Sequence, residues 1–193
     1  AYRDLNFSKA PDSYRSLPII QDRCVYVSTF SKPYCPGLKT GYGIASTKIS
    51  NILTRLKGNH DFGSSRLNQA LLVRIIELGL YDKQRDNLID LYKRKAQALQ
   101  SAWNQKLGEK FSLRFPDGGL YFWVSLPFDT GRESIFFQHC LDENVLVVPG
   151  EYCSFDDDPA AKKAIRLTYG NVNENEIEEG ISRLSRAIFK TLS

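Results

Sequence analysis

Apolar residues recur along the chain at two spacings, and the spacing separates strands from helices. Short runs rich in β-branched and aromatic residues predict strands over residues 24–30 and 41–45. Helical spacing follows over residues 49–56 and again from Leu67 to Leu78. A longer helix, predicted from residue 82 onward, carries an apolar stripe at steps of three and four, formed by Leu88, Tyr92, Ala96, Leu99 and Trp103. We expect this stripe to pack in a core.

Shorter elements of mixed type follow the long helix. Strands are predicted over residues 111–115 and 120–126, with a turn from Pro116 to Gly119 between them. A helix over residues 133–143 leads into an apolar strand over residues 145–148. This part of the chain therefore predicts a small unit of helices and strands.

The last two predicted elements are a strand over residues 164–168 and a final helix. The strand carries one charge, Arg166, between apolar neighbours. Asn173 is expected to cap the helix, and Glu176, three residues later, completes a capping box. The whole order predicts an α/β fold: residues 1–105 end a larger α/β domain with its connecting helices, and residues 106–193 form a small α+β domain.

Composition and charge narrow the classes of function. The net charge of +4 is spread over 193 residues without a block of Lys or Arg, which gives no support for nucleic-acid binding through this segment. No apolar run is long enough to cross a membrane. His60 and His139 stand alone, so we expect no metal site. The four cysteines are scattered without a CxxC pair, which predicts reduced thiols and a cytoplasmic location.

Lys32 lies where the first predicted strand meets a loop. In open α/β sheets, ligands bind at the carboxyl ends of strands. A lysine amine at such a place can form a Schiff base with an aldehyde cofactor. Thr29 and Ser31 add hydroxyls, and Lys39 adds a cation across the Pro36-Gly37 turn, a set that suits a phosphate group. The more frequent alternative, a solvated surface lysine, stays open on these residues alone.

Arg166 alternates with Ile165 and Leu167, so its guanidinium would face a cleft and could bind a carboxylate through two hydrogen bonds. The alternative is an ion pair with the acidic run at residues 156–158. Tyr121, beside the Gly118-Gly119 pair, could line a substrate pocket. Simple alternation of core and surface residues explains Tyr121 equally well.

The spelling of residues 29–42, TFSKPYCPGLKTGY, resembles the lysine motif of fold-type I pyridoxal-phosphate (PLP) aminotransferases of class I/II. The resemblance implies that Lys32 forms the Schiff base with PLP and later moves protons between the substrate α-carbon and the cofactor. It also implies that Thr29 and Lys39 bind the cofactor phosphate, with Ser31 in the same site. The fold implied is the C-terminal part of the large PLP-binding domain plus the small C-terminal domain.

Other motifs occur in the order of that family. Ala1-Tyr2 resembles the end of the Asp-x-Ala-Tyr motif, whose tyrosine binds the ring hydroxyl of the cofactor. Gly63-Ser64-Ser65 is similar to the segment that reaches the cofactor phosphate of the other subunit, and a helix amino terminus there would attract phosphate. Residues 116–123 and 145–150 resemble strands of the small domain. Ile165-Arg166 matches the strand whose arginine holds the substrate α-carboxylate, which favours that role over the ion pair.

The sequence also departs from the family pattern. Lys39 stands where the family has arginine. Lysine cannot form the bidentate hydrogen bonds that arginine makes to phosphate, which predicts weaker cofactor binding. Pro33 biases the backbone of Lys32 to extended conformations. In this family the aspartate at the cofactor ring nitrogen, the glycine-rich phosphate loop and the stacking aromatic residue precede the position of Ala1. Since PLP chemistry depends on that aspartate, we expect this chain alone to be catalytically inactive.

The joint match of Lys32 and Arg166 predicts a fragment of an aminotransferase similar to the kynurenine/2-aminoadipate group. It would move an amino group between an amino acid and a 2-oxo acid by ping-pong chemistry. A PLP decarboxylase or lyase would use the same lysine, but a clamped carboxylate disfavours decarboxylation. The main alternative is a non-enzyme: the aminotransferase-like sensor domain of a PLP-binding transcriptional regulator, which would tolerate Lys39. A fragment with only a structural or interaction role would show no cofactor colour at Lys32.

Members of this family are usually homodimers, so a second copy is an expected partner beside the small-molecule substrates. The helices between residues 49 and 108 normally pack on parts of the fold outside this sequence. We therefore expect exposed apolar surface on them and a tendency to self-associate.

Overall fold

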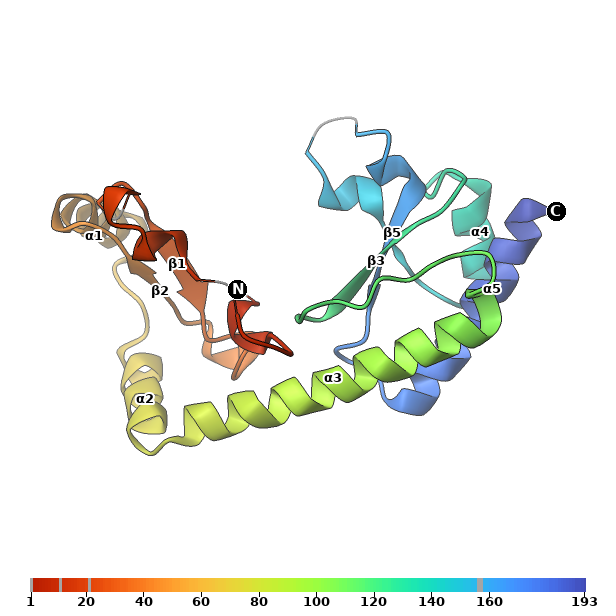
Figure 1. The fold of residues 1–193 in the computed structure, drawn as a ribbon. Coiled ribbons are helices and arrows are strands. Elements are labelled where there is room, and N and C mark those ends of the chain that lie inside the picture. The colour runs from red at the N-terminus through yellow and green to blue at the C-terminus, as the bar shows by residue number, and fades with distance from the viewer. Residues whose placement is uncertain (1, 11, 21, 156–157) are drawn as a thin grey trace. The chain divides into compact units, whose positions relative to one another are not determined.

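The computed structural model describes residues 2–10, 12–20, 22–155 and 158–193. The chain divides into two compact units, which we call unit 1 (Ala1–Asp90) and unit 2 (Leu91–Ser193). The boundary lies inside helix α3 (Leu80–Leu107), which starts in unit 1 and ends in unit 2 (Figure 1). The predicted domain boundary at residue 105 concerns the larger fold rather than contacts within this chain, and it stays a prediction.

Unit 1 is built on a two-stranded antiparallel sheet. Strand β1 (Tyr26–Thr29) pairs with β2 (Gly41–Ile44), and Thr29 lies opposite Gly41 at the end of the ladder. Glycine is required at position 41 because a Cβ atom there would lie 2.6 Å from the Ser28 carbonyl oxygen. Both strand predictions are thus confirmed, with slightly shorter strands. The short 3-10 helices of this unit are η1 (Arg3–Leu5), η2 (Tyr14–Ser16), η3 (Pro18–Ile20) and η4 (Pro36–Leu38).

Helices α1 (Thr47–Asp61) and α2 (Arg66–Glu77) follow the sheet and confirm the two helix predictions. Helix α1 continues beyond the predicted end at residue 56, through Gly58, and has no buried residue. Its large apolar side chains Ile52, Leu53 and Leu56 are exposed, as expected. Helix α2 buries Leu72 and Ile75, whereas Leu67 and Leu71 are exposed. The buried side of α2 is therefore defined by Leu72 and Ile75, and the predicted apolar positions Leu67 and Leu71 lie on a neighbouring, exposed side of the helix.

Unit 2 contains a three-stranded antiparallel sheet in the order β3-β5-β4. These strands span Tyr121–Ser125, Ala164–Thr168 and Val148–Pro149, respectively. Arg166 in the central strand lies between Trp123 and Val148 of its two neighbours. The alternate positions Phe122, Val124, Ile165 and Leu167 are buried. Arg166 therefore stands on the face of the sheet opposite those core residues.

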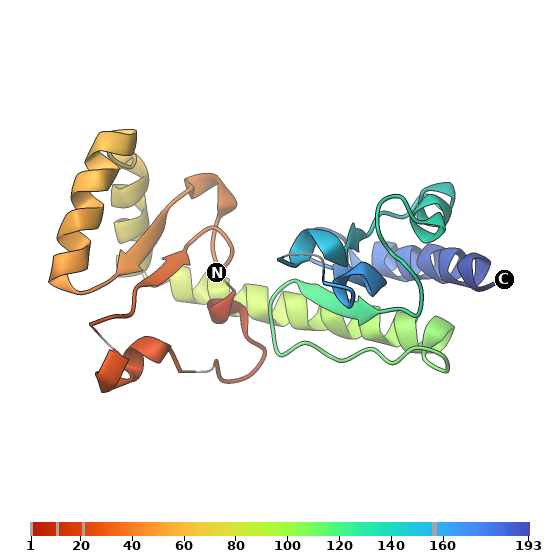
Figure 2. The same cartoon turned by 90° about the horizontal axis from the view of Figure 1, so that it is seen from above.

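Helices α4 (Ile135–Asp142) and α5 (Glu174–Leu192) lie side by side next to this sheet (Figures 1 and 2). The predicted capping box at Asn173 and Glu176 is present, with both of its hydrogen bonds. The apolar positions of α5 and the second half of α3 are buried, including Ile181, Leu184 and Trp103. Two further 3-10 helices are η5 (Gly150–Cys153) and η6 (Ala161–Lys163). Among the described residues, none of the helices combines the length and apolar character needed to span a bilayer.

Two predicted strands are wrong in whole or in part. Residues 111–115 form no strand, because side chains of α3 bind their carbonyl groups: Trp103 Nε1 donates to Phe111 O at 2.8 Å and Gln100 Nε2 to Leu113 O at 3.2 Å. The predicted strand at 145–148 shrinks to β4, since Val145 N donates back to Cys140 O at 2.9 Å and completes the end of α4. In both places a neighbouring helix uses the backbone groups that a strand would need.

Candidate active site

Lys32 lies in a tight turn that follows β1. The turn is closed by hydrogen bonds from Phe30 N to Thr40 O at 3.0 Å and from Tyr34 N to Phe30 O at 3.1 Å. Pro33 is buried, whereas Lys32 itself is exposed. The turn is therefore anchored by its backbone and by Pro33, and it presents the lysine amine outward.

Tyr2 lies beside Lys32 although thirty residues separate them. The Lys32 Nζ atom is 5.9 Å from the centroid of the Tyr2 ring, within reach of a cation–π contact. The Tyr2 carbonyl oxygen accepts a hydrogen bond from Leu5 N at 3.0 Å, and Leu5 is fully buried. The structure thus brings together Lys32, predicted to form the Schiff base, and Tyr2, predicted to bind the ring hydroxyl. Ala1, which precedes Tyr2 in the predicted motif, lies outside the described residues.

The residues predicted to bind phosphate are grouped around the loop between β1 and β2. Thr29 Oγ1 donates to Thr40 O at 3.2 Å and accepts from Ser31 N at 3.1 Å. Lys39 is exposed and has a left-handed backbone with φ of 47°. Because the Thr29 hydroxyl proton points to Thr40, a phosphate would have to compete for it. The exposed Lys39 ammonium makes no hydrogen bond or ion pair with the residues that the structure describes, so a phosphate would meet no such competitor there.

The start of α2 is tied to the same loop. Asn68 Nδ2 donates to Leu38 O at 3.0 Å, directly before Lys39. Ser65, not Ser64, caps the helix by accepting from Asn68 N at 3.3 Å. Ser64 is exposed one residue earlier. Asn68 was not found by sequence reasoning, because one amide on a helix gives no signal until the loop it binds is known.

Arg166 forms the second group of interest, together with Tyr121. The Arg166 Cζ atom is 4.5 Å from the centroid of the Tyr121 ring. Its Nε atom is buried and has no hydrogen-bond partner among the residues that the structure describes. A buried donor without an acceptor costs free energy, so this N–H suits a carboxylate ligand.

The acidic-run alternative for Arg166 finds no support in the residue of that run which the structure describes. The carboxylate of Asp158 accepts hydrogen bonds from Ala160 N at 2.9 Å and from Ser154 Oγ at 3.3 Å. Asp156 and Asp157, the rest of the run, lie outside the described residues. An apolar cavity of about 210 Å³ adjoins Arg166 and is lined by Val148, Thr168 and Ile177 among others.

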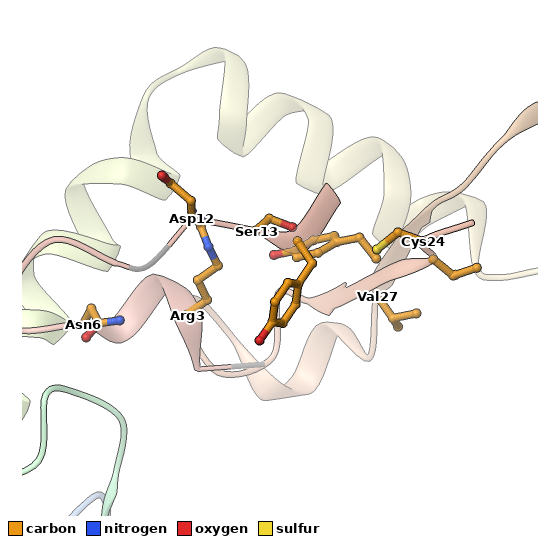
Figure 3. A pocket seen from close by; sticks show the side chains of 9 residues that line it. Arg3, Asn6, Asp12, Ser13, Cys24 and Val27 are labelled. Carbon is orange, nitrogen blue, oxygen red and sulfur yellow. The ribbon is translucent and has the colours of Figure 1, made fainter. Parts of the chain in front are cut away.

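A larger open pocket of about 430 Å³ lies beside β1 and does not include Lys32 (Figure 3). Arg3 and Asn6 reach it from the start of the chain, and Cys24 and Val27 from the region of β1. Neither Lys32 nor the residues predicted to bind phosphate line this pocket. We therefore assign the candidate chemistry to the Lys32 turn and not to this pocket.

Tyr81 is a further residue of the site that sequence reasoning missed. It lies in the first turn of α3, half-buried, and its ring contacts Phe30 and Tyr34 on the two sides of Lys32. A signal was present, because Tyr81 precedes Leu88 by seven residues and so extends the apolar stripe by two turns.

The chain is similar to known proteins over most of its length. The sequence model of the family described as "Aminotransferase class I and II" matches residues 1–184. A 2-aminoadipate transaminase from Thermus thermophilus is 29% identical over 196 residues, which cover 97% of this chain and 47% of that protein. The crystal structure of an α-aminoadipate aminotransferase from the same organism, complexed with N-(5′-phosphopyridoxyl)-L-leucine, has a TM-score of 0.82 and 28% identity, covering 100% of this chain and 49% of that one. The α/β fold prediction is confirmed.

Proteins of another kind are also similar. The uncharacterized HTH-type transcriptional regulator YisV of Bacillus subtilis is 29% identical over 181 residues, which cover 94% of this chain and 36% of that protein. The chain therefore spans about half, or less, of the length of the relatives it matches.

Proposed function

The chain belongs to the class I and II aminotransferase family, and we propose that it forms part of a PLP-dependent aminotransferase that moves an amino group between an amino acid and a 2-oxo acid. The observation that carries this proposal is the Lys32 amine, exposed on an anchored turn and 5.9 Å from the Tyr2 ring. PLP, when bound, supplies an aldehyde that reacts with amines and a ring that withdraws electrons from the attached carbon.

The Lys32 amine would hold the cofactor through its aldehyde group. When not bound to the cofactor, the Lys32 amine would take a proton from the substrate α-carbon and return it elsewhere. Tyr2 would donate a hydrogen bond to the ring oxygen of the cofactor. Lys39 and Ser31 would contact its phosphate, with Thr29 contributing if its hydroxyl leaves Thr40. Ser64 would reach the cofactor phosphate of the other subunit.

Arg166 would bind the α-carboxylate of the amino acid. Its buried Nε–H lacks a partner among the described residues, and its guanidinium packs on the Tyr121 ring, which restricts where the fork can point. A carboxylate would satisfy the free donor and would meet a cation that is already held in place. We assign Tyr121 to the same substrate site through this contact.

The sequence similarity to a transcriptional regulator supports a second candidate function, that of a PLP-binding sensor domain. The percentage identity to that regulator, 29% over 181 residues, equals the percentage identity to the transaminase, although the match to the transaminase is longer, at 196 residues. Both functions need Lys32 to react with PLP. Only the enzyme must release a 2-oxo acid from an amino acid, and this reaction separates the two.

We further propose that the protein acts as a homodimer in the cytoplasm. The exposed apolar residues Ile52, Leu53 and Leu56 on α1 require a covering surface, which either the rest of the larger fold or a second copy can supply. The support for a second copy is the resemblance to a family of homodimers. We also expect this chain alone to be inactive, since it spans about half the length of the enzymes it resembles.

The test is capture of PLP. The chain, and the longest protein that carries it, are each mixed with PLP and reduced with borohydride, and the modified lysine is located by peptide mass mapping. We expect modification at Lys32, its loss in Lys32→Ala, and its retention at higher PLP concentration in Lys39→Ala. Modification spread over several surface lysines, unchanged in Lys32→Ala, would refute the proposal. Release of a 2-oxo acid from an added amino acid, lost in Arg166→Ala, then distinguishes the enzyme from the sensor.

A further inference from the structure

Tyr81 contacts the residues on both sides of Lys32. Its ring is edge-on to that of Phe30, with centroids 5.6 Å apart, and 5.9 Å from that of Tyr34. Phe30 precedes Lys32 by two residues, and Tyr34 follows it by two. Phe30 and Tyr34 are also joined by the hydrogen bond that closes the turn. The Tyr81 ring therefore packs against both ends of the turn that presents the lysine.

The hydroxyl of Tyr81 reaches a different segment. It donates a hydrogen bond to Asp4 Oδ2 at 3.2 Å. Asp4 belongs to η1, which begins directly after Tyr2 and is anchored by the buried Leu5. One side chain thus joins the Lys32 turn through its ring and the Tyr2 segment through its hydroxyl.

The hydrogen bond from Tyr81 to Asp4 is expected to be retained over a wide range of pH. Burial, together with the nearby Asp4 carboxylate, raises the pKa of the Tyr81 hydroxyl well above its ordinary value of 10.0. The phenol therefore stays protonated, and remains a donor to the carboxylate, over the whole physiological range. A hydrogen bond to a charged acceptor is also stronger than a neutral one.

We propose that Tyr81 is a positioning residue for the Lys32 site: its ring holds the lysine turn and its hydroxyl holds the Tyr2 segment, so that amine and phenol stay side by side. The proposal rests on the proposed function, because it assigns Tyr81 a task in PLP binding. Tyr81 itself would touch neither cofactor nor substrate, and it would act through Tyr2 and Lys32.

The first experiment separates the two contacts of Tyr81. Tyr81→Phe keeps the ring and removes the hydrogen bond, and Asp4→Asn weakens the same bond from the other side. We expect each change to weaken PLP capture at Lys32 by about tenfold or more, the worth of one hydrogen bond to a charged group. The double variant should capture PLP no more weakly than either single variant, because both substitutions remove the same hydrogen bond. Tyr92→Phe, another half-buried tyrosine of α3, is the matched control and should bind PLP normally.

A spectroscopic signature distinguishes positioning from a general loss of structure. If Tyr81 acts by holding Tyr2 at the cofactor, Tyr81→Phe should shift the visible absorbance of Lys32-bound PLP in the same direction as Tyr2→Phe. Far-UV circular dichroism should stay unchanged in both. Normal PLP capture and an unshifted spectrum in Tyr81→Phe would overturn the proposal.

A second measurement needs no cofactor. Amide hydrogen exchange of the peptide covering residues 2–8, which the Tyr81 hydroxyl holds through Asp4, should be faster in Tyr81→Phe than in the unaltered chain, and unchanged in Tyr92→Phe. Equal exchange in all three proteins would also overturn the positioning role. If Tyr81→Phe shows the expected faster exchange but the unaltered chain captures no PLP at Lys32, the proposed function fails while the structural role of Tyr81 stands.

Discussion

The two units of the chain differ in how their residues are held. Unit 2 has a continuous apolar core, including Phe122, Phe136, Ile165 and Leu184, all at most 1% exposed. In the described part of unit 1, only Leu5, Leu72 and Ile75 are buried among the apolar side chains other than Pro33. The rest of unit 1 is held by a short sheet, by aromatic contacts and by single hydrogen bonds such as that between Tyr81 and Asp4.

The two proposed functional residues, Arg166 and Lys32, are therefore supported in different ways. Arg166 stands on a sheet with its own core, so its position depends on packing within the unit. Lys32 stands on a turn whose support comes from a few directional contacts. Directional contacts fix geometry with little buried area but contribute less free energy each than core packing. We therefore expect unit 2 to resist unfolding and unit 1 to be sensitive to small changes near the turn.

The largest expected effect comes from the core of unit 2. Trp103→Ala removes a fully buried ring and its hydrogen bond to Phe111 O, and should destabilise the unit by about 3–5 kcal/mol. Urea unfolding followed by circular dichroism measures this. Trp123→Ala is the control, because Trp123 is 47% exposed and should cost much less. An equal loss of stability in both variants would contradict the view that burial in the core of unit 2 sets the cost.

The next largest effect tests the sheet of unit 1. Gly41→Ala places a Cβ atom 2.6 Å from the Ser28 carbonyl oxygen and should destabilise the β1–β2 pairing by about 1–3 kcal/mol. Hydrogen exchange of both strands should accelerate, and PLP capture at Lys32 should weaken with it. Gly43→Ala is the matched control, since its Cβ would meet nothing closer than 3.8 Å. An unchanged Lys32 turn in Gly41→Ala would contradict the dependence of the site on this sheet.

A smaller effect is expected at the start of α5. Asn173→Ala removes the side-chain half of the capping box and should cost about 1 kcal/mol of stability. Chemical denaturation of the chain measures the change, and PLP capture should not respond because unit 1 is untouched. Ser182→Ala, on the same helix but away from its cap, serves as the control. A changed affinity for PLP would show that the two units are more strongly coupled than their separate cores suggest.

The smallest effect depends on pH. Hydrogen bonds from Lys190 and Arg186 lower the pKa of Glu143 from its ordinary 4.5 to about 2. A carboxylate with a lowered folded-state pKa stabilises the fold above pH 4.5 and loses that contribution as the pH falls toward 2. Glu143→Gln should therefore lower the urea midpoint at pH 7 and progressively less below pH 4.5. Glu178→Gln, exposed on α5, should show no such pH trend.

Much of the fold was readable from local pattern. The stripe from Leu88 to Trp103 and the Asn173–Glu176 capping box predicted α3 and α5, because the spacing of apolar residues and the chemistry of helix starts act within a few residues. The strand around Arg166 was predicted with its exact bounds for the same reason. The strand predictions at residues 111–115 and 145–148 failed, because their backbone groups are used by helices whose positions no local pattern specifies.

The site divides in the same way. The sequence by itself determined which residues have the right chemistry: an amine after a strand at Lys32, a cation at Lys39 and a guanidinium at Arg166. Only the tertiary structure placed Tyr2 beside Lys32, Tyr121 beside Arg166, and Tyr81 between Asp4 and the lysine turn. The physical reason is that chemical type and helix or strand period are properties of neighbouring residues. Contacts across thirty or seventy-seven residues depend on how the whole chain folds back on itself.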